Sequence, residues 1–129
     1  MDEYQFPKFG KSSEIPQPAN NNEYIDPKAL LKLRDIDDLI KKTQSKVNGR
    51  MTLFRDRSDM AEQDQDTAGY LLMEEQIRSL QALQDACVKV EERRRVLLDE
   101  PDSETLRDAG ALHSQLESIV KEYEQILGD

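Results

Sequence analysis

Residues 67–127 contain two long segments whose apolar spacing constrains the fold more than any other feature of the chain. In both segments mostly apolar residues, with Arg94 and His113 among them, recur at alternating steps of three and four, the spacing of a coiled-coil-like seam. The segments meet at Asp99-Glu100-Pro101-Asp102, where proline cannot continue a helix. The pattern predicts helices over 67–99 and 103–127 that fold back on each other. The seam residues are Leu80, Leu83, Cys87, Val90, Arg94 and Leu97, then Leu106, Ala109, His113, Leu116, Val120, Tyr123 and Leu127.

A further helix is predicted over residues 27–47. Asp26 suits the N-cap and Pro27 suits the first helical position, where its missing N–H costs nothing. Apolar residues follow at helical spacing, and Asn48-Gly49 is typical of a helix end. The alternative is a helix that runs through Asn48-Gly49, because Met51 would continue the seam. The apolar series is Leu30, Leu33, Ile36, Ile40 and Val47.

The start of the second helix is also open to two interpretations. Asp59 followed by Glu62 matches a capping box, so this helix could begin near Met60 instead of Thr67. At 1.5 Å per residue the second helix is expected to be the longest of the three. Its polar first turns are therefore expected to overhang the other two.

The third predicted helix has an apolar face about twice as wide as a two-stranded coiled coil needs. Leu112, Ile119 and Ile126 form a second apolar line beside its seam, and a face that wide favours two neighbouring helices. Residues 26–48 hold six basic and four acidic side chains, whereas 101–129 hold two basic and seven acidic, so the first helix is a complementary neighbour. We expect an all-α fold over residues 26–129, either a three-helix antiparallel bundle or a long helical hairpin with coiled-coil-like packing. A dimer that swaps the first helix would satisfy the same heptads.

Residues 1–25 lack any helical or strand period and are expected to form a disordered tail. This segment nevertheless holds four of the seven aromatic residues in the chain. The functional hypothesis is a short linear peptide carrying Tyr4, Phe6 and Phe9 that docks in a groove on a partner or on the bundle itself. The alternative is a solvated tail that happens to contain aromatics.

Composition excludes several classes of partner. With 27 acidic and 18 basic side chains the formal net charge is −9, which repels nucleic-acid phosphates and anionic lipid headgroups. No stretch approaches the roughly 18 apolar residues that a membrane span needs. The N-terminus shows neither a basic nor an apolar signal-peptide region. We therefore expect a cytoplasmic protein that binds no nucleic acid and is not inserted in a membrane.

The sequence offers no constellation for catalysis or for binding a metal or cofactor. It has one histidine, His113, and one cysteine, Cys87, which rules out a Cys/His zinc site. Both residues fall on helical seams, so His113 is expected to be partly buried and Cys87 to act as a small buried hydrophobe. The five glycines are scattered singly, without a phosphate-binding loop. We expect no enzyme activity and no cofactor.

The functional prediction is a protein-protein interaction module, a small helical subunit or adaptor that binds a helical partner by coiled-coil-like packing. Homo- or hetero-oligomers would both fit. One alternative is a small acidic chaperone for a helical secretion client, and another is an acidic mimic that inhibits a nucleic-acid-binding protein. Arg93 and Arg95 could dock an acidic partner, although Glu91 and Arg95 also stand at the spacing of an intrahelical pair. The candidate partner-binding residues are Tyr4, Phe6, Phe9, Arg93, Arg95, Leu112, Ile119 and Ile126.

Overall fold

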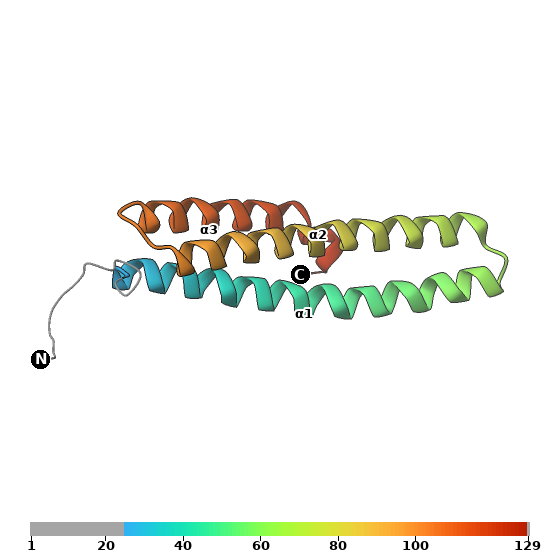
Figure 1. Ribbon diagram of the computed structural model, residues 1–129. Helices are drawn as coiled ribbons and strands as arrows, with labels where there is room; N and C mark the ends of the chain where they lie inside the picture. The colour runs from blue at the N-terminus through green and yellow to red at the C-terminus, as the bar shows by residue number, and fades with distance from the viewer. Residues whose placement is uncertain (1–24, 129) are drawn as a thin grey trace, which may run out of the picture.

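The computed structural model describes residues 25–128, which form four α-helices and no strand. The elements are α1 (Pro27–Gln63), α2 (Thr67–Asp99), α3 (Thr105–Glu122) and the single turn α4 (Glu124–Leu127). Helices α1 and α2 form a long antiparallel hairpin, and α3 returns alongside both of them (Figure 1). The predicted all-α fold with three packed helices is confirmed.

Helix α1 runs straight through Asn48-Gly49, so the predicted helix end at residue 47 is wrong and the alternative is right. Asn48 and Gly49 are exposed, while Val47 and Met51 on either side are buried. A helical glycine costs about 1 kcal/mol relative to alanine. Burial of Met51 and Phe54, at about 1.5–3 kcal/mol each, outweighs that cost.

Helix α2 begins at Thr67, as the first interpretation of its start predicts, and not near Met60. Asp59 and Glu62 lie inside α1 and therefore cap nothing. The Asp66 side chain is the cap, because its Oδ1 accepts the Gly69 backbone N–H at 3.0 Å. Because α1 extends to Gln63, it runs beside the start of α2, so the expected overhang of α2 is wrong. The expectation that the second helix is the longest is also wrong, since α1 has 37 residues and α2 has 33.

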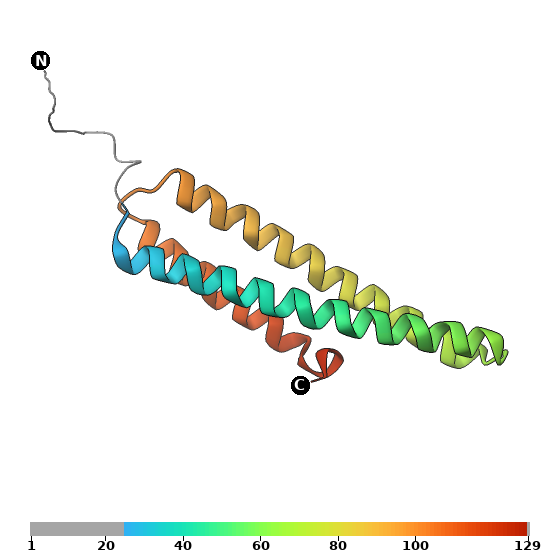
Figure 2. The ribbon, with the colours of Figure 1, turned by 90° about the horizontal axis from the view of Figure 1, so that it is seen from below.

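The third helix is shorter than the predicted span 103–127. Helix α3 ends at Glu122, and α4 turns toward the middle of α1 before Gly128 ends it with a φ of 77° (Figure 2). The Arg50 side chain fixes this turn, because its Nε donates to the Ile126 carbonyl oxygen at 3.0 Å. The same guanidinium lies over the Phe54 ring, 4.8 Å from its centroid.

The difference in helix length divides the molecule into two parts. At 1.5 Å per residue, α1 is about 55 Å long and α3 about 27 Å long. In the part that we call the proximal half, α3 packs against both α1 and α2, as its wide apolar face predicts. In the distal half, α1 and α2 continue as a two-helix hairpin (Figures 1 and 2). The fully buried side chains of the core include Leu33, Ile36, Val47, Leu80, Leu83, Cys87 and Leu116.

Candidate partner-binding surface

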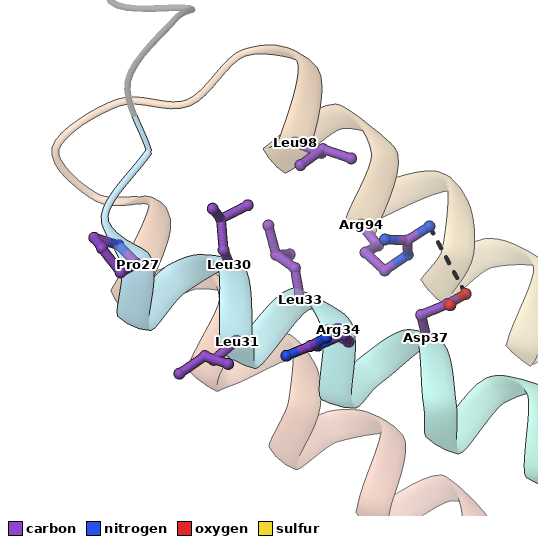
Figure 3. A pocket seen from close by; sticks show the side chains of 8 residues that line it. All are labelled: Pro27, Leu30, Leu31, Leu33, Arg34, Asp37, Arg94 and Leu98. Carbon is purple, nitrogen blue, oxygen red and sulfur yellow. Dashed lines mark ion pairs between the residues drawn. The ribbon is translucent and has the colours of Figure 1, made fainter.

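An open apolar groove lies at the end of the proximal half, between the first turns of α1 and the last turns of α2 (Figure 3). It encloses about 640 Å³. Leu30 and Leu31 are exposed beside it, Leu31 by 53%. Position 94 on the α2 seam is occupied by an arginine, so apolar packing of α2 against α1 is interrupted here. The groove is lined by Pro27, Leu30, Leu31, Leu33, Arg34, Asp37, Arg94 and Leu98.

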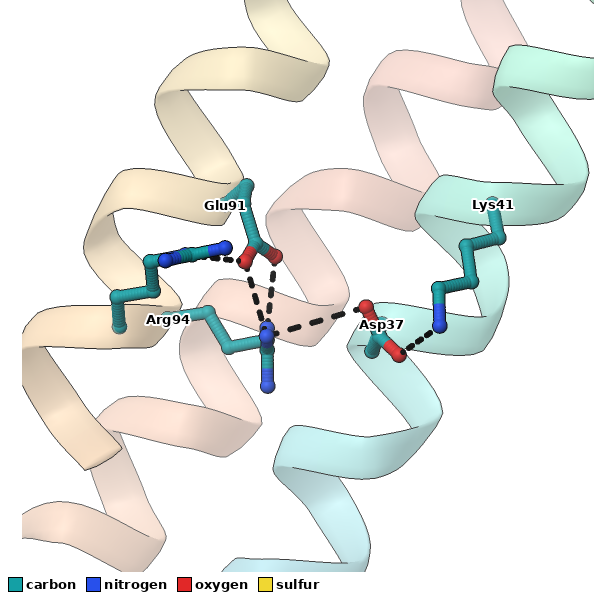
Figure 4. Close-up of polar contacts among 5 residues, drawn as sticks. Asp37, Lys41, Glu91 and Arg94 are labelled. Atoms are coloured by element: carbon teal, nitrogen blue, oxygen red, sulfur yellow. Dashed lines mark hydrogen bonds and ion pairs between the residues drawn. The ribbon is translucent and has the colours of Figure 1, made fainter.

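A network of charged side chains closes one side of this groove (Figure 4). Arg94 donates from Nε and Nη2 to the two carboxylate oxygens of Glu91, at 2.7 and 2.9 Å. Its Nη2 also lies 3.8 Å from Asp37 on α1, and Asp37 pairs with Lys41 at 3.0 Å. Arg95 adds a hydrogen bond from Nε to Glu91, at 2.8 Å. Arg94 therefore connects α2 to α1 at the edge of the groove.

The electrostatics of the network favour the ionised carboxylate. The hydrogen bond from Arg94 is the largest cause that lowers the pKa of Glu91 to about 2, with a further contribution from Arg95. The same hydrogen bond raises the pKa of Arg94. Both shifts point the same way, so this edge of the groove keeps its charges across the physiological pH range.

The structure separates the sequence-predicted binding residues into distinct environments. Leu112 is buried in the bundle, so it serves the core instead of presenting a surface. Together with Ile119 and Arg93, its side chain lines a groove of about 290 Å³ between α2 and α3. Ile126 borders a different hollow, where α4 meets Gln76. Arg95 is exposed and pairs within α2, as the intrahelical alternative predicts.

Other predictions concern residues outside these surfaces. Tyr4, Phe6 and Phe9 lie outside the described residues. Cys87 is buried in the core, and burial raises the pKa of its thiol, so the predicted structural role is confirmed. His113 is partly buried as predicted, with Nδ1 3.8 Å from a carboxylate oxygen of Glu117.

Sequence reasoning missed the proximal groove as a surface. The helical spacing places Leu30 on the apolar seam, and this prediction is wrong because Leu30 is exposed. The buried residue in the same helical turn is Ala29. The available signal was Leu31, an apolar residue away from the seam and next to a second leucine. Leu98 gives the same signal at the end of α2, where it follows the seam residue Leu97.

Comparison of the chain with known protein families, with characterised proteins and with solved structures gives no match. Within residues 25–128, no helix combines the length and apolar character that crossing a bilayer requires. The same residues contain no cluster of three or more side chains suited to hold a metal ion.

Proposed function

We propose that this protein is a non-enzymatic interaction module, a small helical subunit or adaptor that binds a helix of a partner protein in the proximal groove. The observation that carries the proposal is the pair of exposed leucines on α1, Leu30 and Leu31, beside an open groove floored by Leu33 and Leu98. A self-contained bundle does not need apolar side chains gathered around an open groove, and such gatherings mark binding sites.

A helix is the occupant that fits this groove best. The groove runs between the ends of two helices, and an amphipathic helix binds such a site through apolar anchors spaced three and four residues apart. Arg34 and the Asp37–Arg94 pair stand at its polar edges. Polar residues flanking the anchors of the partner would meet these side chains, giving the apolar centre and polar rim of a specific interface.

The test is site-specific photo-cross-linking in cells that contain the partner proteins. A photoreactive phenylalanine at position 31 should give a defined adduct, because Leu31 stands on the groove. The matched control carries the photoreactive phenylalanine at position 42, which is an exposed lysine on α1 outside the groove lining. This control should give no adduct. Adding Leu30→Glu to the position-31 protein should abolish the adduct, since it places a charge among the apolar contacts. Equal adducts from positions 31 and 42 would contradict the proposal.

The same experiment separates the two alternative functions. A subunit keeps its partner, whereas a chaperone for a secretion client loses the adduct once the client is delivered. An acidic mimic of nucleic acid would bind through charge, so its adduct would disappear at high salt and in competition with DNA. The apolar lining of the groove favours binding that persists in high salt. We place this activity in the cytosol, the compartment that the sequence predicts.

A further inference from the structure

The distal half carries a second face without a covering helix, and this face continues the surface that α3 covers in the proximal half. On α2, Leu72 precedes Val90 by 18 residues, which is five full helical turns, so both side chains point in the same direction. Val90 is buried beside Leu112 of α3. Leu72 is 51% exposed, and it lies one turn before Gln76, where α2 borders a hollow beside Tyr123 and Ile126 at the end of the α3–α4 segment.

Helix α1 supplies the other side of this face. Arg57 follows Arg50 by seven residues, and Met60 follows Leu53 by the same interval, so each pair shares a side of the helix. Arg50 contacts α4, which places this side of α1 toward the C-terminal end of the bundle. Met60 is 62% exposed. We name the surface the distal face and define it by Leu53, Arg57, Met60, Leu72 and Gln76.

Charge indicates what kind of helix this face suits. Arg50 already donates to a backbone carbonyl at the C-terminal end of the α3–α4 segment, the negative end of a helix. One heptad further, Arg57 is exposed and forms no ion pair with any residue in 25–128. The segment that packs on Arg50 is itself acidic, with five acidic and two basic side chains over 103–128. The same chemistry repeated at Arg57 calls for a helix that presents a carbonyl or carboxylate oxygen at this one position.

A second copy of the chain fits this face less well. Two distal faces related by a two-fold axis would bring equivalent positions together near the axis. Arg57 lies midway between Arg50, where α4 docks, and the end of α1 at Gln63. It would therefore approach the equivalent arginine of the other copy, and like charges at an interface oppose association.

We propose that the distal face binds an amphipathic helix of a partner protein, which lies end to end with α3 and extends the three-helix bundle toward the hairpin tip. Leu53, Met60 and Leu72 contact its apolar side, and Arg57 binds a carboxylate or carbonyl oxygen that this helix presents. The site is independent of the proximal groove, since the two surfaces share no residue.

The test uses the full-length protein and a fluorescent peptide with the sequence of residues 103–128, an amphipathic segment that packs on α1 and α2 in the proximal half. Binding is followed by fluorescence anisotropy. Leu72→Glu and Arg57→Glu should each weaken binding about tenfold or more, the effect of losing about 1.4 kcal/mol. Leu71→Glu is the matched control, because Leu71 is 60% exposed and neighbours Leu72 but points about 100° away from it. This variant should bind within about twofold of the parent.

Each outcome decides the proposal. The proposal is overturned if the peptide does not bind. It is also overturned if the peptide binds equally to the Leu72→Glu and Leu71→Glu variants, because the peptide would then be displacing α3 instead of binding the distal face. Light scattering on the same samples is the further check. A dimer of the full chain that Leu72→Glu dissociates would assign the face to a second copy and overturn the proposal. Circular dichroism melts of the variants verify folding, and these exposed positions should leave Tm nearly unchanged.

Discussion

Replacing Gly49 by alanine should stabilise the protein, and the sign of this effect tests the continuity of α1. The residue lies in the interior of a 37-residue helix and is exposed. A Cβ built on Gly49 meets no atom within 4 Å. The substitution therefore adds no clash, and it removes backbone freedom from the unfolded chain.

The expected gain for Gly49→Ala is about 0.5–1 kcal/mol in the free energy of unfolding. With an unfolding entropy of about 2.1 cal/mol/K per residue over the roughly 100 folded residues, this gain raises Tm by about 2–5 °C. Thermal melts followed by circular dichroism at 222 nm resolve such a shift. Urea denaturation provides the free energy independently, from a change of midpoint at constant m-value.

Two other glycines serve as controls for the Gly49→Ala experiment. Gly110 lies inside α3, also with no atom within 4 Å of an added Cβ, so Gly110→Ala should stabilise by a similar amount. Gly128 has a φ of 77°, and its added Cβ would lie 3.1 Å from the Arg50 guanidinium carbon, so Gly128→Ala should destabilise. If Gly49→Ala lowered Tm as Gly128→Ala does, Gly49 would be ending a helix in a left-handed conformation, and a continuous α1 would be refuted.

Three further substitutions test the packing and the electrostatics. Leu80→Ala removes a fully buried side chain and should cost about 3 kcal/mol in urea denaturation, whereas Leu71→Ala at an exposed site should change stability by less than about 0.5 kcal/mol. Glu91→Gln should destabilise by about 1–3 kcal/mol at pH 7, because hydrogen bonds from arginines hold the folded-state pKa of Glu91 near 2, below its ordinary value of 4.5. That contribution is complete above pH 4.5 and is lost as the pH falls toward 2, so the difference between Glu91→Gln and the parent should shrink over this range; a constant difference would contradict the assignment. Arg50→Met should cost about 1 kcal/mol and speed amide hydrogen exchange in α4, since it removes the hydrogen bond to the Ile126 carbonyl.

The helical fold could be predicted because its signals are local and repeated. The 3,4 spacing of the α2 seam recurs for about five turns, from Leu80 to Leu97, and Pro101 ends the helical pattern, so the bounds 67–99 agree with the structure. The N-cap at Asp26 is confirmed for a similar reason, since its Oδ1 accepts the Lys28 N–H at 2.9 Å. The double width of the α3 apolar face correctly indicated two neighbouring helices.

The wrong helix end at residue 47 shows where local signals fail. Asn48-Gly49 resembles a helix end because its residues have low helix propensity, a difference of about 1 kcal/mol. The decisive energy comes from Met51 and Phe54, which are buried in the core that α1 forms with the other helices. A sequence pattern cannot weigh a contact with a helix tens of residues away, and the helix that provides it was itself expected to overhang.

Predicting the candidate sites requires knowing which apolar residues are buried by a neighbouring helix. Leu72 and Val90 point the same way from α2, yet Val90 is buried and Leu72 is exposed. What separates them is the place where α3 stops, and the break at Tyr123 leaves only a weak trace in the sequence. The surfaces available to partners are thus set by helix length, a property of the tertiary structure.

The positions of the two surfaces bear on how the module could work. Leu31 in the proximal groove and Met60 in the distal face are 29 residues apart on one continuous helix, about 44 Å along its axis. Partner helices bound at these two positions would not overlap unless one of them extended along most of α1. Variants of Leu30 and of Leu72 should therefore impair two bindings independently, and a single long partner would instead be weakened by both. The comparison distinguishes an adaptor that joins two proteins from a subunit held along its whole length by one.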